Sequence, residues 1–180
     1  MLTDYRIVLR PLLIQDAADV ARLAGDEAVS KWTSSIPYPY SKQKAVAWIS
    51  QLDSDRSKFR FAIEVEGRLA GCVSFWPYRK EGVEVGYWVG REFWGKGVCT
   101  QALRLLFASE TFPAHLDVYA KVMVDNEASI RVLEKTGFEY LKAGTVAKGG
   151  RDIPAKFYIR HSKDRNGSQA KMDSVPDKSH

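Results

Sequence analysis

Hydrophobic residues change their spacing along the chain, and the spacing predicts where each element lies. Polar and apolar residues alternate over 6–11, which predicts a strand. Residues 16–24 place their apolar side chains on one helical face, and a short helical piece is expected over 27–32. Ser41 is suited to cap a further helix, whose apolar face runs over 45–52.

From residue 59 the hydrophobic period is two. Residues 59–65 and 69–76 flank a Glu-Gly-Arg turn, so they predict a hairpin, and 83–89 predict a third strand. A loop with three glycines follows over 90–97, and a helix is expected over 98–109.

The last elements are a strand over 116–124, a helix that Asn126 caps, and a closing hairpin of 138–147 with 151–159. The helix is expected to end at Gly137. The order β-α-α-α-β-β-β-α-β-α-β-β predicts an α/β (α+β) fold with a mixed sheet and helices packed on it.

The 180 residues fit one domain, expected over 1–161. Residues 162–180 are polar and without a hydrophobic period, and we expect them to form a disordered C-terminal tail. A hydrophobic content of 45% excludes a chain that is disordered throughout. No apolar run is long enough to cross a bilayer, and the N-terminus does not resemble a signal peptide, so a cytoplasmic location is expected.

The net charge of the chain and the spacing of its cysteines and histidines limit the classes of ligand that the sequence predicts. The 27 basic and 22 acidic residues give a net charge of +5, spread along the chain. This charge fits an anionic ligand but gives no sign of nucleic-acid binding or of a membrane partner. Cys72 and Cys99 form no CxxC pair and the three histidines are scattered, so no metal site is expected.

The glycine-rich loop is the strongest local signal. Glycines allow a ligand to approach the backbone closely, and the following helix start offers unpaired N–H groups, which together suit a phosphate. Lys96 adds a positive charge within the loop. Neither a P-loop nor a dinucleotide-binding fingerprint matches the residues. A simple sharp turn between strand and helix remains the alternative.

Two motifs together resemble the GNAT acetyltransferase superfamily. Residues 86–103, Gly-Tyr-Trp-Val-Gly-Arg-Glu-Phe-Trp-Gly-Lys-Gly-Val-Cys-Thr-Gln-Ala-Leu, are similar to its coenzyme A-binding motif, in the form of the RimJ/RimL type. Residues 125–138, Asp-Asn-Glu-Ala-Ser-Ile-Arg-Val-Leu-Glu-Lys-Thr-Gly-Phe, are similar to its second motif. The resemblance covers about residues 5–160. It implies a mostly antiparallel central sheet of about seven strands and acetyl-CoA as co-substrate.

The resemblance also implies the cofactor-binding residues. Main-chain N–H groups of the loop are expected to hold the pyrophosphate, and one strand is expected to bond the pantetheine amides. Two further side chains, from the second motif, are expected to face the pantetheine and the thioester. The loop residues are Trp94, Gly95, Lys96, Gly97, Val98, Cys99 and Thr100, the strand residues are Tyr87, Trp88 and Val89, and the second motif contributes Asn126 and Ser129.

At the thiol-side proton donor the chain departs from the family pattern. Many family members have a tyrosine in the second motif, where this chain has Leu133. Ser129 lies four residues upstream on the same helical face and is the nearest substitute. The alternative is that Ser129 only supports the helix N-terminus or bonds the cofactor.

Glu84 is the candidate on the amine side. It shares a strand face with Gly86 and Trp88, and a carboxylate there would bind a substrate ammonium and relay its proton. The alternative is a surface glutamate paired with Arg79 or Lys80.

Cys99 also invites a catalytic interpretation, because a helix N-terminus and Lys96 both lower a thiol pKa. Its place in a small-residue position favours packing over an acetylated enzyme. Trp32, Tyr38, Tyr40, Trp76 and Tyr78 are the expected walls of an acceptor pocket.

The predicted activity is direct transfer of the acetyl group of acetyl-CoA to a primary amine. The resemblance includes protein N-termini among the acceptors. Polyamines, aminoglycosides and amino acids are the small-molecule alternatives, and a non-catalytic acyl-CoA-binding sensor is the alternative outside enzymes. A monomer or a homodimer is expected.

Overall fold

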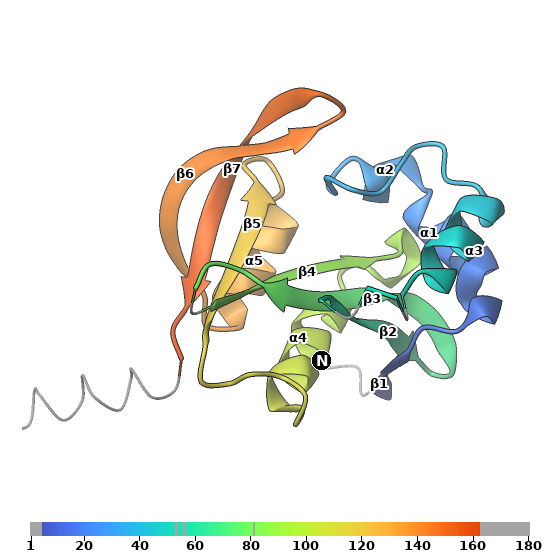
Figure 1. Cartoon of the computed structure of the whole chain (residues 1–180), viewed down its shortest axis with the longest axis horizontal. Helices are drawn as coiled ribbons and strands as arrows, with labels where there is room; N and C mark the ends of the chain where they lie inside the picture. Colours follow the sequence, from blue (N-terminus) through green and yellow to red (C-terminus); the bar gives the residue numbers. More distant parts are fainter. Residues whose placement is uncertain (1–4, 53, 56, 81, 163–180) are drawn as a thin grey trace, which may run out of the picture.

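The structure is a computed structural model that describes residues 5–52, 54–55, 57–80 and 82–162. Its helices and strands follow the predicted order, with bounds that differ by at most three residues (Figure 1). The strands are β1 (Ile7–Pro11), β2 (Phe59–Val65), β3 (Arg68–Pro77), β4 (Gly82–Val89), β5 (Asp117–Met123), β6 (Glu139–Lys148) and β7 (Arg151–Arg160). The α-helices are α1 (Ala17–Ala24), α2 (Glu27–Ser30), α3 (Lys42–Ser50), α4 (Val98–Ala108) and α5 (Glu127–Lys135), and two 3-10 helices are η1 (Ile14–Asp16) and η2 (Arg91–Phe93).

The strands form one seven-stranded sheet in the order β1-β2-β3-β4-β5-β7-β6. Every neighbouring pair is antiparallel except β4 and β5, which run parallel. That parallel pairing extends over only three residues, from Gly82–Glu84 to Asp117–Tyr119. The predicted fold, a mixed and mostly antiparallel sheet flanked by helices, is confirmed.

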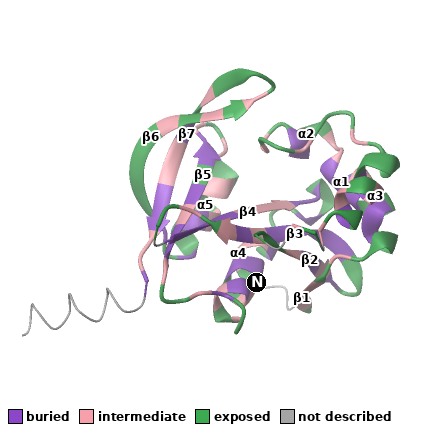
Figure 2. Ribbon diagram, viewed as in Figure 1, coloured by how far each residue is buried: buried purple, intermediate pink, exposed green. Residues whose placement is uncertain are grey.

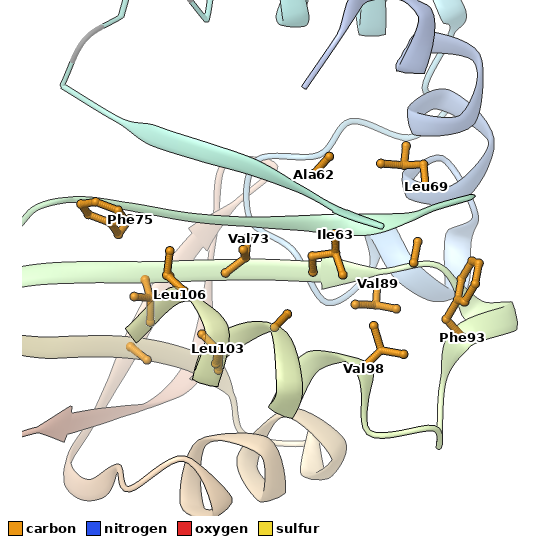
Figure 3. Packing of buried hydrophobic residues seen from close by; sticks show 14 of the residues in the cluster. Ala62, Ile63, Leu69, Val73, Phe75, Val89, Phe93, Val98, Leu103 and Leu106 are labelled. Atoms are coloured by element: carbon orange, nitrogen blue, oxygen red, sulfur yellow. The ribbon is translucent and has the colours of Figure 1, made fainter. Parts of the chain in front are cut away.

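Helices cover both faces of the sheet, as the alternation of side chains along each strand requires. On one face, Leu103 and Leu106 of α4 pack beneath Ile63 and Val73 (Figure 3). All four are fully buried. Ala62 points to the opposite face, on the side of α1 and α3 (Figure 3). Removing a buried leucine side chain of this kind typically costs about 2–5 kcal/mol.

Arg10 ties the first strand to its surroundings. Its guanidinium bonds both carboxylate oxygens of Asp16, at 2.8 and 2.9 Å, and also Glu64 of β2 at 2.6 Å. Asp16 is buried and accepts a further hydrogen bond from the amide of Leu13. The Leu-Arg-Pro sequence around Arg10 therefore has a structural role, since this cluster fixes how the chain passes from β1 into α1.

The β6–β7 hairpin extends beyond the rest of the sheet, and β6 is largely exposed (Figure 2). Near its tip, the ammonium of Lys148 donates to the carbonyls of Ser30 and Lys31, at 2.6 and 2.7 Å. The hairpin is thereby joined to the end of α2. At the other end of β7, Ser162 is buried and its amide donates to Asp117, although the expected tail included it. The remainder of that tail, 163–180, lies outside the described residues.

Candidate active site

One cleft of about 1310 Å³ collects most of the predicted site residues. It runs from the aromatic residues after α2, across β3 and β4, to the start of α4 and the first turns of α5. Tyr38 and Lys96 are the two predicted residues that do not line it. Those that do are Trp32, Tyr40, Trp76, Tyr78, Glu84, Tyr87, Trp88, Val89, Trp94, Gly95, Gly97, Val98, Cys99, Thr100, Asn126 and Ser129.

The cleft lies where β4 and β5 separate. Beyond Glu84, the remaining residues of β4, Val85–Val89, have no pairing register with β5 in the described structure. At the end of this segment, the indole N–H of Trp94 donates to the carbonyl of Val89 at 2.8 Å. A strand edge of this kind offers main-chain hydrogen bonds to an extended ligand.

The glycine loop presents backbone at the start of α4. Gly97 is the N-cap of α4 with a φ of 74°, in the left-handed region that favours glycine. A side chain at this position would meet no protein atom within 4 Å, because it would point into open space. The unpaired N–H groups of the first turn of α4 make this end of the cleft suited to an anion. A loop was predicted over 90–97, and the short helix η2 lies within it.

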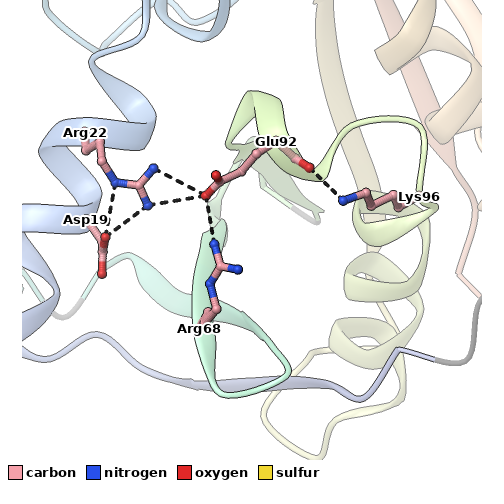
Figure 4. A network of polar contacts seen from close by, with 5 residues as sticks. All are labelled: Asp19, Arg22, Arg68, Glu92 and Lys96. Carbon is pink, nitrogen blue, oxygen red and sulfur yellow. Dashed lines mark hydrogen bonds and ion pairs between the residues drawn. The ribbon is translucent and has the colours of Figure 1, made fainter.

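A polar network fixes this loop to the domain (Figure 4). The Glu92 carboxylate accepts from Arg22 of α1 at 3.3 Å and from Arg68 at 3.4 Å. Arg22 also bonds Asp19 at 3.1 Å. Lys96 turns away from the cleft, and its ammonium donates to the Glu92 carbonyl at 2.9 Å. These charges are exposed and each contributes little to stability, so their effect is to position the loop.

Ser129 lies in a hydrogen-bonded group on the α5 side of the cleft. Its hydroxyl is 2.7 Å from the Tyr87 hydroxyl, and its amide donates to Asn126, which caps the helix as predicted. Burial raises the pKa of Tyr87 well above its usual value, so this phenol keeps its proton at any physiological pH. Leu133 is buried and lines the cleft one turn further along. Strand alternation already placed Tyr87 on the face opposite Glu84, but not its contact with Ser129.

Glu84 is buried, with 8% of its surface exposed, so the surface alternative is wrong. Its carboxylate pairs with Lys121 of β5 at 2.9 Å, and not with Arg79 or Lys80 as that alternative supposed. Arg79 instead lies over the rings of Tyr78 and Tyr119. The sequence analysis missed Lys121. The parallel register opposes Glu84 to Tyr119, and Lys121 is two residues further on the same face.

Both cysteines are desolvated side chains with unreactive, protonated thiols. Burial raises the pKa of Cys99 to about 12, and the pKa of Cys72 likewise to about 12. The lowering expected from the helix N-terminus and Lys96 is therefore outweighed by desolvation, and Lys96 points elsewhere. At neutral pH Cys99 is a protonated thiol, which supports the packing interpretation.

The aromatic residues separate into two groups. Trp32, Tyr40, Trp76 and Tyr78 line the cleft, whereas Tyr38 is 60% exposed and lies outside it. The ring of Trp76 lies over Gly86, where an added Cβ would come within 2.9 Å of it. Glycine at 86 thus lets the Trp76 ring lie against β4 next to Glu84.

The described part of the chain contains neither a cluster of metal ligands nor a membrane-spanning helix. There, no three His, Cys, Asp or Glu side chains gather in a way that would hold a metal ion. None of the helices described is long and apolar enough to cross a membrane.

The cleft, with its unpaired strand segment and its helix N-terminus, suits an extended ligand with an anionic group. Residues 6–139 match the family model of the acetyltransferase (GNAT) domain, and the chain belongs to this family. It is 30% identical to the probable N-acetyltransferase YjcK of Bacillus subtilis (strain 168), over 77% of this chain and 83% of that protein. It is 26% identical to spermidine N(1)-acetyltransferase of Escherichia coli (strain K12), over 77% of this chain and 75% of that protein.

The fold agrees with solved structures of such enzymes. Mycobacterium smegmatis RimJ in complex with CoA-disulfide superposes with a TM-score of 0.75 at 21% identity, covering 88% of this chain and 83% of that one. The protein is therefore an acetyl-CoA-dependent N-acetyltransferase of the GNAT family. This favours the predicted enzyme over the acyl-CoA-binding sensor.

Proposed function

We propose that the enzyme transfers the acetyl group directly to a primary amine that lies between Glu84 and Ser129, with acetyl-CoA along β4 and the α4 N-terminus. The observation that carries this proposal is the cleft itself. It joins the backbone of the glycine loop, the unpaired edge of β4, and one polar group on each side of the space between β4 and β5. The cofactor contacts would be made by the residues that the sequence singled out, apart from the Lys96 side chain.

In the proposed reaction the neutral amine attacks the thioester carbonyl, the C–S bond breaks and the amide forms. Glu84 accepts the proton that the amine loses, directly or through water. Its ion pair with Lys121 holds the carboxylate in a fixed orientation. On the other side, the Ser129 hydroxyl donates to the leaving thiolate, while the Tyr87 hydroxyl holds Ser129 in place. Cys99 takes no covalent part.

The acceptor is a protein N-terminus or a small-molecule amine. Relatives with known names include a putative ribosomal N-acetyltransferase and a spermidine N(1)-acetyltransferase, so the family relation alone leaves both classes open. The RimJ/RimL form of the loop supports the N-terminal amine. A cytoplasmic location and a monomeric or homodimeric state remain predictions.

The test is acetyl transfer from acetyl-CoA to a panel of peptides and small amines, followed by free thiol and by the mass of the product. With an accepted amine, Glu84→Gln should lose most rate at low pH, where the amine is protonated and needs a base. The defect should shrink at high pH. A Glu84→Gln loss that is constant across pH would remove Glu84 from proton transfer, and an acetylated enzyme formed with acetyl-CoA alone would contradict direct transfer.

A further inference from the structure

The cleft carries an excess of positive charge that acetyl-CoA binding accounts for only in part. Among the described residues that line it, Glu84 is the one acidic side chain, and Lys121 already pairs with it. The other charged lining residues are all basic: Lys44, Lys58, Arg60, Arg131 and Lys135.

Four of these basic residues form two groups at opposite sides of the cleft, and the fifth, Lys44, belongs to α3. Arg131 and Lys135 belong to α5, the helix that carries Ser129, so they suit the phosphates of the cofactor. Lys58 directly precedes β2 and Arg60 lies near its start, on the far side of Glu84 from β5. The proposed position of the cofactor, along β4 and the start of α4, gives this second pair no part in cofactor binding.

Arg60 and Lys58 are directed toward the acceptor part of the cleft. Arg60 is in register with Ser74 and, across β3, with Gly86, so its side chain shares the sheet face of Glu84 and Trp76. The ammonium of Lys58 lies over the Trp76 ring, 5.6 Å from its centroid. An aromatic wall therefore separates an acid, Glu84, from two cations on the same face.

The guanidinium of Arg60 is largely buried, but most of its N–H donors have no partner among the described residues. Only 15% of its side chain is exposed, and its ion pair is a single contact of 3.3 Å to Asp55, whose own side chain is 41% exposed. A guanidinium has five N–H donors arranged to bind a carboxylate or phosphate in a bidentate manner. Arg60 therefore retains donors for a ligand in the cleft.

We propose that the acceptor amine carries an anionic group, a carboxylate or a phosphate, which Arg60 and Lys58 bind while Glu84 receives the amine. This inference rests on the proposed function and specifies its substrate class. Two strand spacings and a shift of two residues along the strand separate Arg60 from Glu84, about 12 Å in the sheet, so the anionic group lies roughly 6–10 Å from the nitrogen once side-chain lengths are allowed for. An acidic side chain near a peptide N-terminus fits that distance, and so does an aminoalkyl phosphate. A polyamine does not suit this surface.

Binding measured by calorimetry tests the proposal without turnover. The enzyme saturated with CoA is titrated with the C-terminally amidated peptides Ala-Asp-Ala-Ala, Ala-Asn-Ala-Ala and Ala-Lys-Ala-Ala, and with 3-aminopropyl phosphate and 3-aminopropanol. We expect the aspartyl peptide or the phosphate to bind at least about tenfold more tightly than its neutral partner. If the aspartyl peptide shows this preference, the anion is a carboxylate, and if 3-aminopropyl phosphate shows it, the anion is a phosphate. Higher salt should reduce the preference.

The variants Lys58→Gln and Arg60→Gln should abolish this preference while leaving the affinity for the neutral ligands and for CoA unchanged. Arg104→Gln is the matched control, because Arg104 is an exposed cation of α4 outside the cleft. Equal or tighter binding of the lysyl peptide, no binding of any ligand, or a preference that survives both variants would overturn the proposal. Acetylation of the same ligands is followed separately. A charge preference without any acetyl transfer would reject the proposed function alone.

Discussion

Gly97 and Lys96 are neighbours in the loop, yet only Gly97 faces the cleft. Gly97 has a positive φ and open space in front of it, whereas the Lys96 ammonium is occupied by the carbonyl of Glu92. The loop therefore contributes through its backbone, and the positive charge that stands out in the sequence is directed elsewhere.

We expect Gly97→Val to reduce CoA affinity by at least about tenfold, because a β-branched residue is strained at this φ and its side chain enters the phosphate space. Lys96→Ala should change the affinity by less than about threefold. Calorimetry with CoA measures both, and thermal unfolding checks that each variant is folded. A larger effect of Lys96→Ala would contradict recognition through the backbone.

Ser129 and Tyr87 should act as one unit. Ser129→Ala is expected to lower kcat by roughly ten- to a thousandfold at saturating acetyl-CoA, as for the loss of one positioned polar group. Tyr87→Phe should lower kcat less, by about three- to tenfold, because it frees the Ser129 hydroxyl without removing it. In the double variant, the Tyr87 change should add almost nothing. Fully additive losses would show that Tyr87 acts independently of Ser129.

At the scale of elements, the sequence predicted order and type well, because hydrophobic period, capping residues and turn glycines are local signals. Ser41 and Asn126 cap helices as predicted, for example. What it missed are contacts between residues distant in the chain. The Glu84–Lys121 pair depends on the parallel β4–β5 register, and the exclusion of Tyr38 from the cleft depends on how its loop packs. Neither of these two features can be predicted from the spacing of hydrophobic residues in the local sequence.

The passage from β1 to α1 makes an element-scale prediction. Asp16→Asn removes the charge that Arg10 binds, and should lower the free energy of unfolding by about 2 kcal/mol at neutral pH. Burial alone would raise the Asp16 pKa, but hydrogen bonds from Arg10 and Leu13 outweigh it and lower the pKa below 3.8.

The stabilisation is consequently present above about pH 4 and is lost as the pH falls through the lowered pKa. Wild type and Asp16→Asn should converge in stability in acid, which urea unfolding at several pH values measures. Asp19→Asn is the control, since Asp19 is exposed and should change the stability by less than about 0.5 kcal/mol. A gap that does not narrow as the pH is lowered into the acid range would disprove this account of Asp16.

At the scale of the whole molecule, the acceptor end of the cleft lies between two parts of the chain far apart in sequence. The segment after α2 forms one wall, and the end of β6 contributes Thr145, Val146 and Ala147. Lys148 joins these two parts through its bonds to Ser30 and Lys31. Burial lowers the pKa of Lys148, because the contact takes this ammonium partly out of water.

Lys148→Met should therefore loosen the acceptor end alone. We expect the acceptor KM to rise by about three- to tenfold with the acetyl-CoA KM unchanged, because two hydrogen bonds to a charged donor are lost. Lys142→Met removes an exposed charge from the same hairpin and serves as the control. Steady-state kinetics that show no change in acceptor KM would mean that the hairpin is held by other contacts.

The short parallel pairing of β4 with β5 has a mechanical consequence. The sheet consists of two halves, β1-β2-β3-β4 and β5-β7-β6, and in the described part of the chain three residues on each side pair them directly. A ligand that bonds to Val85–Val89 while touching α5 spans this seam and ties the halves together. The enzyme would then be stiffest when loaded with cofactor and most compliant after CoA departs. Each catalytic cycle would tighten and relax the middle of the sheet itself.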